Sequence, residues 1–89
     1  MAKRAAEIWF VYVLQCADGT LYTGITKDLA RRCQQHNAGT ASRYTRSRRP
    51  VKLVYQEPQG GQSLALKREA AIKKLTRRQK LALIRGCSV

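Results

Sequence analysis

A run of seven residues, Ile8 to Leu14, constrains the fold more than any other stretch of the chain. The run reads I-W-F-V-Y-V-L, so it is rich in β-branched and aromatic residues and does not alternate between apolar and polar ones. This pattern is typical of a strand that is covered on both faces. We therefore predict a strand in the middle of a sheet, which is a rigid position for the side chain of Tyr12.

A reverse turn follows this strand. Residues 16 to 20 read C-A-D-G-T, and the Asp-Gly pair tolerates the positive φ angles of tight hairpin turns. We expect residues 21 to 25 to return antiparallel, so that Tyr12 and Tyr22 lie on neighbouring strands. The sequence leaves open the register of the strands and the facing of the two rings. Gly24 has no Cβ, so another group can approach the end of the second strand closely.

Residues 28 to 36, D-L-A-R-R-C-Q-Q-H, predict a helix. Asp28 is a good N-cap, and Gly39 is a good terminator. On such a helix Arg32 and His36 are one turn apart and share the face that carries the apolar positions. Because a cation and a titratable ring are costly at the edge of a core-facing stripe unless they have partners, this face is the first candidate for chemistry.

Residues 39 to 50, G-T-A-S-R-Y-T-R-S-R-R-P, predict a loop that binds phosphates. Arginines supply bidentate forks, hydroxyl residues supply short donors, and Tyr44 could stack on a base. The arginines of this loop are Arg43, Arg46, Arg48 and Arg49. The simpler alternative is a solvated loop whose arginines only keep the protein soluble.

Apolar residues at positions 51, 53 and 55 alternate with their neighbours, which predicts a third strand from Val51 to Glu57. Pro58 and the Gly60-Gly61 pair are expected to end it. Ser63 is then expected to cap a helix that runs to about residue 75. The core residues predicted for this helix are Leu64, Ala71, Ile72 and Leu75, and the residues predicted to face water are Lys67 and Lys74.

Glu69 lies between the apolar and polar faces of that helix, so its carboxylate is expected at the rim of the packed surface. Thr76 to Gln79, T-R-R-Q, fits a capping box and predicts a last short helix that ends at Gly86. The predicted order is therefore β-β-α-β-α-α, and the predicted fold class is α+β, a three-stranded antiparallel sheet packed with about three helices. Residues 1–89 form a single domain in this interpretation, because so short a chain supplies apolar surface for only one small core, and residues 1–7 are expected to be frayed.

The charge balance is the abnormal quantity, because 18 Lys and Arg residues stand against 5 Asp and Glu residues and give a net charge of +13. Nucleic acid is the expected partner of so basic a small domain. A membrane is excluded as the partner, since the longest apolar run is far shorter than the roughly 20 residues of a spanning helix. Three widely separated cysteines, Cys16, Cys33 and Cys87, predict reduced thiols, and residues 1–7 have no signal-peptide layout, so we expect a cytoplasmic protein.

Four features in this order resemble the GIY-YIG nuclease domain: V-Y-V in the first strand, Y-T-G in the second, an arginine and a histidine on the next helix, and a later helical glutamate. The resemblance covers residues 8 to about 86, and the small size and basic C-terminal helices look most like stand-alone bacterial members. It rests on order and spacing together, because both eponymous triplets are altered. Many members also carry an asparagine a few turns after the glutamate. The corresponding position in this chain falls near Leu81, and the chain has no asparagine beyond Asn37.

The resemblance implies a metal-dependent endonuclease that hydrolyses phosphodiester bonds, with DNA favoured over RNA. Glu69 would hold one Mg²⁺ or Mn²⁺, Arg32 would clamp the phosphate, and Tyr12 would be the general base once nearby positive charge lowers its pKa. The implied catalytic residues are Tyr12, Tyr22, Gly24, Arg32, His36 and Glu69. Arg31 and the loop residues Arg43, Tyr44, Arg46, Arg48 and Arg49 would bind the nucleic acid.

Simpler interpretations stay open at this point. A strand tyrosine is usually a core residue, a lone histidine near a helix end is usually a surface or capped residue, and Glu69 could simply pair with Lys73 one turn on. A non-catalytic nucleic-acid-binding module would keep the basic surface without turnover, and the missing asparagine favours it. A small ribosome-associated basic protein would explain the charge but not the joint presence of the candidate residues.

Overall fold

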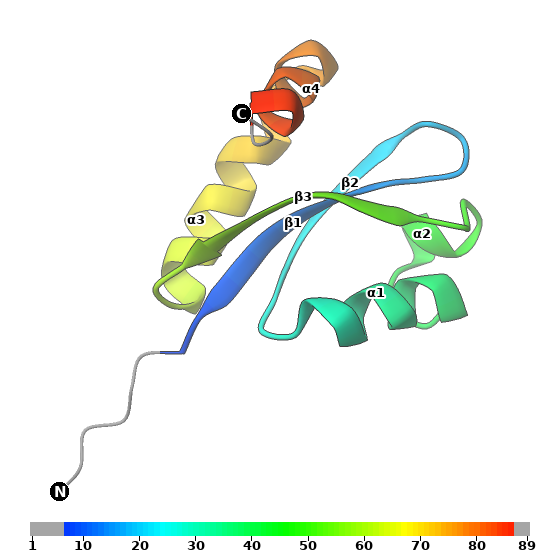
Figure 1. Cartoon of the computed structure of the whole chain (residues 1–89), viewed down its shortest axis with the longest axis horizontal. Helices are drawn as coiled ribbons and strands as arrows, with labels where there is room; N and C mark the ends of the chain where they lie inside the picture. The colour runs from blue at the N-terminus through cyan, green and yellow to red at the C-terminus, as the bar shows by residue number, and fades with distance from the viewer. Residues whose placement is uncertain (1–6, 87–89) are drawn as a thin grey trace, which may run out of the picture.

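The computed structural model describes residues 7–86, and Figure 1 shows their arrangement. The strands are β1 (Trp9–Gln15), β2 (Leu21–Thr26) and β3 (Lys52–Gln59). The helices are α1 (Leu29–Ala38), α2 (Arg43–Arg46), α3 (Gln62–Lys73) and α4 (Arg77–Gly86). The predicted α+β class with a three-stranded antiparallel sheet is confirmed. The four-residue helix α2 lies where the sequence predicted only a loop.

The sheet has the strand order β2-β1-β3, and both pairs of neighbours are antiparallel. The apolar run therefore does form the central strand, as its composition predicted. In the hairpin of β1 and β2, Tyr12 lies opposite Gly24, and Leu14 lies opposite Tyr22. This register places both tyrosines on one face of the sheet, because side chains two positions apart on a strand point the same way.

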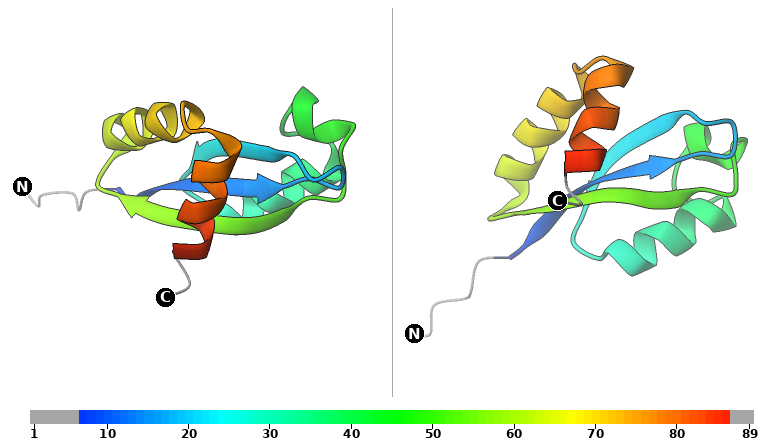
Figure 2. Two further views of the ribbon diagram at one scale, coloured as in Figure 1. Left: turned by 90° about the horizontal axis from the view of Figure 1, so that it is seen from above. Right: turned by 45° about the horizontal axis from the view of Figure 1, so that its top comes forward.

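Two small cores lie on the two faces of β1, because successive side chains of a strand point to opposite faces. Val11 and Val13 belong to one core, which also contains Ala65 and Ile72 of α3 and is contacted by the last helix. Tyr12 and Leu14 belong to the other, which also contains Cys16 and Val51 and is contacted by Leu29 and Cys33 of α1. Figures 1 and 2 show α3 and α1 on opposite sides of the strands. The candidate site residues of β1 and β2 thus face α1.

The third strand extends further than predicted. It spans Lys52–Gln59, and Pro58 lies within it, opposite Phe10, rather than ending it. Proline cannot donate a hydrogen bond to a neighbouring strand, but β3 is an edge strand and has a neighbour on one side only. Proline is therefore a weaker stop signal on this edge strand than it would be on a central one.

A β-bulge also breaks the alternation on which the third strand was predicted. Val13 pairs with Tyr55 and Leu14 pairs with Leu53, so Val54 is the extra residue between them. Leu53 consequently packs in the core beside α1, whereas Tyr55 packs in the core beside α3. A regular strand would have put both side chains on one face.

The predicted start of α3 was wrong, because Ser63 lies inside the helix. Its N-cap is Gly61, and no side chain caps it. The predicted core face was also partly wrong: Leu64 is 51% exposed and Ala71 is exposed, while Ala65 and Ile72 are buried. Leu64 was predicted to lie in the core because leucine is strongly apolar. Ala65 lies there instead, because its small side chain lets the helix backbone approach the sheet closely.

The stripe of α3 that faces the sheet follows the helical spacing of three, four and seven residues from Ala65, and it therefore includes Arg68 and Glu69. Both polar residues are half-buried. The Arg68 guanidinium donates a hydrogen bond to the carboxylate of Glu57 on β3 at 2.8 Å. Glu69 instead pairs with Lys73, one turn along the same helix, at 3.2 Å.

The predicted ends of α1 and the predicted start of α4 are confirmed. The Asp28 carboxylate accepts a hydrogen bond from a backbone N–H in the first turn of α1, and Gly39 ends this helix in the left-handed conformation at φ 83°. The Gln79 backbone N–H donates to the Thr76 hydroxyl, and the Thr76 N–H donates to the Gln79 side chain. This reciprocal pair is the predicted capping box.

Within residues 7–86, no helix combines the length and the apolar character needed to cross a bilayer. Cys16 and Cys33 carry free thiols, as predicted. The predictions for residues 1–6 and for Cys87 lie outside the described residues.

Candidate active site

Gly24 is required by the position of the Tyr12 ring. A Cβ atom on Gly24 would lie 2.6 Å from the Tyr12 hydroxyl oxygen and 2.8 Å from its Cζ. Both distances are shorter than real Cβ contacts allow, and Tyr12 is itself buried. The sequence predicted a close approach at this glycine. The structure identifies the approaching group as the phenol of Tyr12.

Tyr22 and His36 complete an aromatic cluster around Tyr12. The ring centroid of Tyr22 lies 6.4 Å from that of Tyr12 and 5.1 Å from that of His36. The rings of Tyr12 and His36 meet edge to face at 5.8 Å. Tyr22 also stacks on Tyr44 at 5.9 Å, and the cluster thus extends from the buried face of the sheet to α2.

His36 lies in the last turn of α1 and is almost fully buried. Its Nε2 lies 2.9 Å from the Tyr12 hydroxyl, and its Nδ1 lies 2.8 Å from Oγ1 of Thr45, which is also fully buried. Thr45 was not among the predicted site residues, because residues 39–50 were expected to form a loop. The signal that could have found it is Ser42, whose side chain caps α2 and sets the following turn.

The hydrogen bonds of Thr45 favour one tautomer of His36. The Thr45 hydroxyl donates its one hydrogen to the backbone carbonyl of Ser42 at 3.3 Å. A hydroxyl that donates to Ser42 accepts from His36, and this arrangement puts the ring proton on Nδ1 and makes Nε2 an acceptor. Nε2 in turn accepts the hydroxyl hydrogen of Tyr12. The result is one directed chain of hydrogen bonds from Tyr12 through His36 and Thr45 to Ser42.

Burial is the main cause of the pKa shifts of Tyr12 and His36. Burial, with a smaller contribution from Tyr22, raises the pKa of Tyr12 above its usual value, although the positive charge of Arg32 opposes the rise. The expectation of a lowered pKa is therefore wrong for the protein alone, because desolvation of the phenolate outweighs the nearby charge. Burial and Arg32 both lower the pKa of His36, which is accordingly neutral at pH 7 and able to accept a proton.

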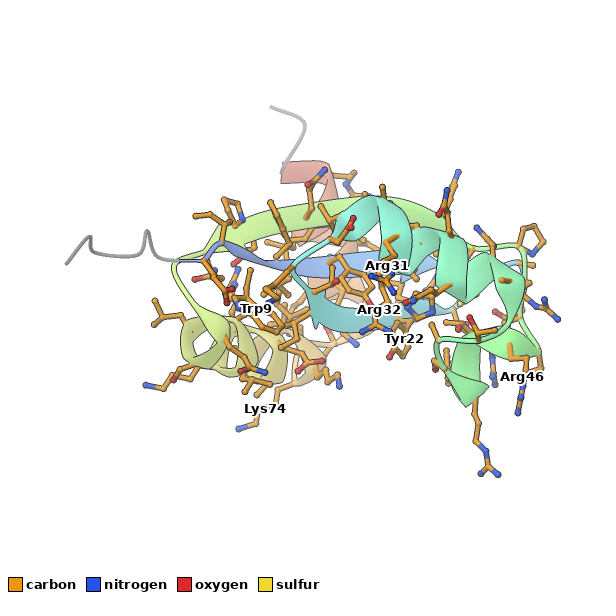
Figure 3. All side chains as sticks on the ribbon, turned by 90° about the horizontal axis from the view of Figure 1, so that it is seen from below. Trp9, Tyr22, Arg31, Arg32, Arg46 and Lys74 are labelled. Carbon is orange, nitrogen blue, oxygen red and sulfur yellow. The ribbon has the colours of Figure 1, made fainter. Side chains whose placement is uncertain are left out.

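Arg32 and Arg31 differ in their surroundings although they are adjacent. Arg32 is half-buried, and its charge acts on both Tyr12 and His36, whereas Arg31 is exposed. Both arginines line an open cleft of about 370 Å³ beside the aromatic cluster. Figure 3 shows them on the same side of the molecule as Trp9, which lines this cleft too. Arg32 is thus placed to interact with the cluster, as the helical register predicted.

Glu69 lies on α3, on the other side of the sheet from α1, and its negative charge makes a small contribution to the raised pKa of Tyr12. Its side chain is 18% exposed and pairs with Lys73, which is 55% exposed. No group of three or more histidine, cysteine or acidic residues that could hold a metal ion occurs in the described part of the chain. A single carboxylate with a solvated partner still fits Mg²⁺, because this ion keeps several waters and takes few protein ligands.

The four loop arginines separate into two pairs. Arg48 donates to the Asp18 carboxylate at 3.1 Å and to a backbone carbonyl at 2.8 Å, and Arg49 donates to two backbone carbonyls. Their guanidinium groups therefore tie the loop together. Arg43 and Arg46 are exposed and make no such contact within residues 7–86, which leaves them available for phosphates.

Known proteins resemble this chain over most of its length. Residues 8–82 match the GIY-YIG catalytic domain. A UPF0213 protein of Desulfotalea psychrophila is 58% identical over 79 residues, which cover 88% of this chain and 72% of the relative. A UPF0213 protein of Staphylococcus aureus strain Mu3 is 54% identical over 76 residues, covering 85% and 93%. The solution NMR structure of a UPF0213 protein from Bacillus halodurans superposes with a TM-score of 0.56 at 39% identity, covering 86% of this chain and 82% of the other.

Proposed function

This chain belongs to the GIY-YIG catalytic domain family, and from that premise we propose that it is a metal-dependent endonuclease that hydrolyses phosphodiester bonds in nucleic acid, with DNA favoured over RNA. The observation that carries the proposal is the buried hydrogen-bond chain from Tyr12 through His36 to Thr45. A structural role for Tyr12 needs only one partner for its hydroxyl. A chain that fixes the tautomer of the partner, next to an arginine and a carboxylate, is what proton transfer from a water to a base requires.

His36 resolves the difficulty that the raised pKa of Tyr12 creates for a general base. In the tautomer that Thr45 favours, the phenol donates its hydrogen to the unprotonated Nε2 of His36, 2.9 Å away. As the attacking water gives its proton to the Tyr12 oxygen, the phenol hydrogen moves to Nε2, so no free phenolate has to form in the buried site. Thr45 holds the Nδ1–H of the resulting imidazolium.

In this proposal Arg32 binds the non-bridging oxygens of the scissile phosphate. It is the half-buried cation whose charge acts on the pKa values of both Tyr12 and His36. Glu69 would hold Mg²⁺ or Mn²⁺, and the chemistry that such an ion supplies when bound is neutralisation of negative charge at the phosphate and the leaving oxygen. Tyr22 packs against Tyr12 and His36 and keeps both rings in position.

The reaction then balances as a hydrolysis. The water oxygen forms a bond to phosphorus, and the bond from phosphorus to the leaving oxygen breaks. The proton lost by the water is held on His36 through Tyr12, and solvent returns one proton to the leaving oxygen. The products are a phosphate monoester end and a free hydroxyl end. The cytoplasmic location expected from the sequence is part of this proposal.

A non-catalytic nucleic-acid-binding module is the second candidate, and the use of Asn37 favours it. Asn37 is the one asparagine in the chain. Its side-chain amide donates to the backbone carbonyl of Val51 at 3.1 Å and its oxygen accepts the Val51 N–H at 2.8 Å. Both groups are engaged in joining α1 to the start of β3, so this asparagine does not replace the one that many family members carry after the glutamate.

One experiment separates these two candidates. The protein is incubated with branched, flapped and single-stranded DNA and RNA in Mg²⁺ or Mn²⁺, beside a Glu69→Ala control and samples with chelator. The nuclease proposal expects cleavage of at least one substrate that chelator and Glu69→Ala abolish. Binding of every substrate without cleavage in either metal would favour the binding module.

A further inference from the structure

The open cleft beside the candidate active site has an aromatic side and a cationic side. It measures about 370 Å³. Trp9 supplies the aromatic surface, Arg31 and Arg32 supply cations, and the residues that complete its lining are Thr26, Lys27, Asp28 and Gln35. Trp9 is the one tryptophan in the chain, and it is half-buried against the core beside α3. One part of the ring is therefore fixed by packing, while another part faces the cleft.

We propose that this cleft binds an unpaired nucleobase of the substrate, stacked on Trp9, next to the phosphate held by Arg32. The substrate class is then nucleic acid with a single-stranded nucleotide at the point of cleavage, such as a single strand or a flap. The proposal rests on the nuclease function and specifies its substrate. Every nucleobase has a face that can stack on an aromatic ring, so the site selects unpaired structure rather than sequence.

Size and lining both favour a base over the other groups of a nucleotide. The cleft is at the lower end of the roughly 300–1,000 Å³ of pockets that bind small molecules, which suits one base. A phosphate alone would need cations but no indole ring. An apolar ligand would not need Arg31, Arg32 and Lys27 around it. Single-stranded nucleic acid presents the required pair of groups, a flat ring and a neighbouring phosphate.

In the free protein the side chain of Lys27 lies over the ring of Trp9, where it is only weakly held. Its ammonium lies 5.6 Å from the ring centroid and pairs with Glu7 at 3.4 Å. Both side chains are more than half exposed, so the pair is weak and screened by salt. A stacking base can take the place of the ammonium, which then reaches the phosphate of the same nucleotide.

Tyr44, an exposed aromatic residue near the site, is less suited to this role. Tyr44 already stacks on Tyr22 at 5.9 Å and carries the Arg48 guanidinium 4.0 Å from its ring centroid. Arg48 is held in place by Asp18 and by a backbone carbonyl of α2. The sequence predicted that Tyr44 could stack on a base. In this proposal Trp9 takes that role, because the ring of Tyr44 is already in contact with Tyr22 and Arg48.

Because Trp9 is the single tryptophan, its fluorescence reports this cleft alone. The wild-type protein is titrated without divalent metal against four probes of equal length: single-stranded DNA, single-stranded RNA, blunt duplex DNA and an abasic deoxyribose-phosphate strand. Fluorescence anisotropy of labelled probes measures binding in parallel. We expect both base-bearing single strands to quench Trp9, while the duplex and the abasic strand bind without quenching. Equal quenching by the abasic strand, or quenching by none, would overturn the proposal.

Three variants keep the test independent of folding defects. Trp9→Leu should weaken binding of the base-bearing single strand by roughly tenfold and leave binding of the abasic strand unchanged. Trp9→Phe, which keeps a ring and most of the packing, should restore most of that affinity. Lys27→Ala leaves Trp9 in place and uncovered, so quenching should persist. A Lys27→Ala protein that is no longer quenched, or a Trp9→Leu protein that loses affinity equally for both strands, would contradict base stacking.

These experiments can also reject the cleft proposal and the nuclease proposal independently of each other. Base-dependent quenching without any cleavage in Mg²⁺ would retain the cleft and reject the nuclease. Cleavage of blunt duplex at the rate of single strands, without quenching, would retain the nuclease and reject the cleft.

Discussion

The Tyr12 hydroxyl lies 2.9 Å from Nε2 of His36, although the two residues are 24 positions apart and come from the central strand and the end of a helix. The contact is buried on both sides. It joins the group with a raised pKa to the group with a lowered one, so in the resting protein the phenol keeps its proton and the neutral His36 ring is its hydrogen-bond partner.

Thr45→Val should slow catalysis more than it harms folding. Valine has nearly the shape of threonine but cannot hold the Nδ1–H of His36, so the preferred tautomer is lost and one buried donor is left without a partner. We expect a cost of about 1–3 kcal/mol in stability and a fall in kcat of about 10–100-fold, the range seen when a residue that orients a histidine is removed. Single-turnover cleavage and thermal melting measure the two effects.

Thr45→Ser is the matched control, because it keeps the hydroxyl and should restore most of the rate. Nitrogen-15 NMR of the His36 ring gives a readout that does not depend on activity. The wild type and Thr45→Ser should show a protonated Nδ1 and an unprotonated Nε2, and Thr45→Val a mixture. An unchanged tautomer in Thr45→Val would show that Thr45 does not position the ring.

The stability of the protein should fall as the pH is lowered through the usual pKa of histidine. Burial keeps the folded-state pKa of His36 below 6.5, so the unfolded chain takes up a proton first as the pH falls. The neutral ring therefore contributes stability that is fully present above about pH 6.5 and is lost progressively below it. Since the chain has one histidine, melting temperatures between pH 7.5 and 5 isolate this effect, and His36→Asn should flatten the curve.

Arg32→Ala should lower the cleavage rate by about 10²–10³-fold, the effect of removing one donor that stabilises transition-state charge. Arg31→Ala should leave the chemical step nearly unchanged, because this side chain is exposed, whereas it is the charge of Arg32 that acts on the pKa values of Tyr12 and His36. Single-turnover rates at saturating protein compare the two variants without interference from weaker binding. Similar losses would mean that the adjacent arginines share the clamp.

Arg43 and Arg46 should affect binding, whereas Arg48 and Arg49 should affect folding. Replacing either exposed arginine with alanine should reduce the slope of log affinity against log salt by about one, as expected for each lost phosphate contact. Arg48→Ala should instead lower the melting temperature, because the guanidinium links the loop to Asp18 and to α2. Equal slopes in the wild type and in Arg43→Ala would remove this residue from the interface.

The fold was predictable where local patterns and tertiary packing agree. The buried run of β1 was predictable for this reason, and so were the caps of α1 and the capping box of α4. The facing of β3 was not, because a bulge at Val54 moves Tyr55 to the other face and no local signal marks it. The register of α3 was missed because close packing on the sheet selected Ala65 over the more apolar Leu64.

The same distinction holds for the candidate site. Spacing along one helix was enough to put Arg32 and His36 on a common face, and a hairpin was enough to bring the two tyrosines onto neighbouring strands. Ser42 could have indicated the turn that carries Thr45, but the contact of Thr45 with His36 depends on how α2 packs against the end of α1. The direction of the Tyr12 pKa was missed for a related reason, because burial is a property of the packed structure.

Glu69→Gln separates catalysis from binding, because it removes a carboxylate charge while nearly preserving shape. If Glu69 holds the metal, cleavage should fall at least about 100-fold, whereas affinity for nucleic acid should stay equal or rise because one negative charge is gone. If Glu69 only pairs with Lys73, the loss is limited to about 0.3–0.5 kcal/mol for such a pair on a helix. That would shift the melting temperature by only about 1–4 °C and leave cleavage intact.

Glu57→Gln is the matched control, because Glu57 has the same 18% exposure and also pairs with a cation, in this case Arg68. Hydrogen bonds from Tyr55 and Arg68 hold the pKa of Glu57 below its usual value even though burial alone would raise it, so this carboxylate is already fully used in joining β3 to α3. Its replacement should lower the melting temperature and leave cleavage by the folded fraction unchanged. Rate, affinity and melting temperature of both variants decide the assignment, and a folded Glu69→Gln protein that cuts at the wild-type rate would exclude Glu69 as the metal ligand.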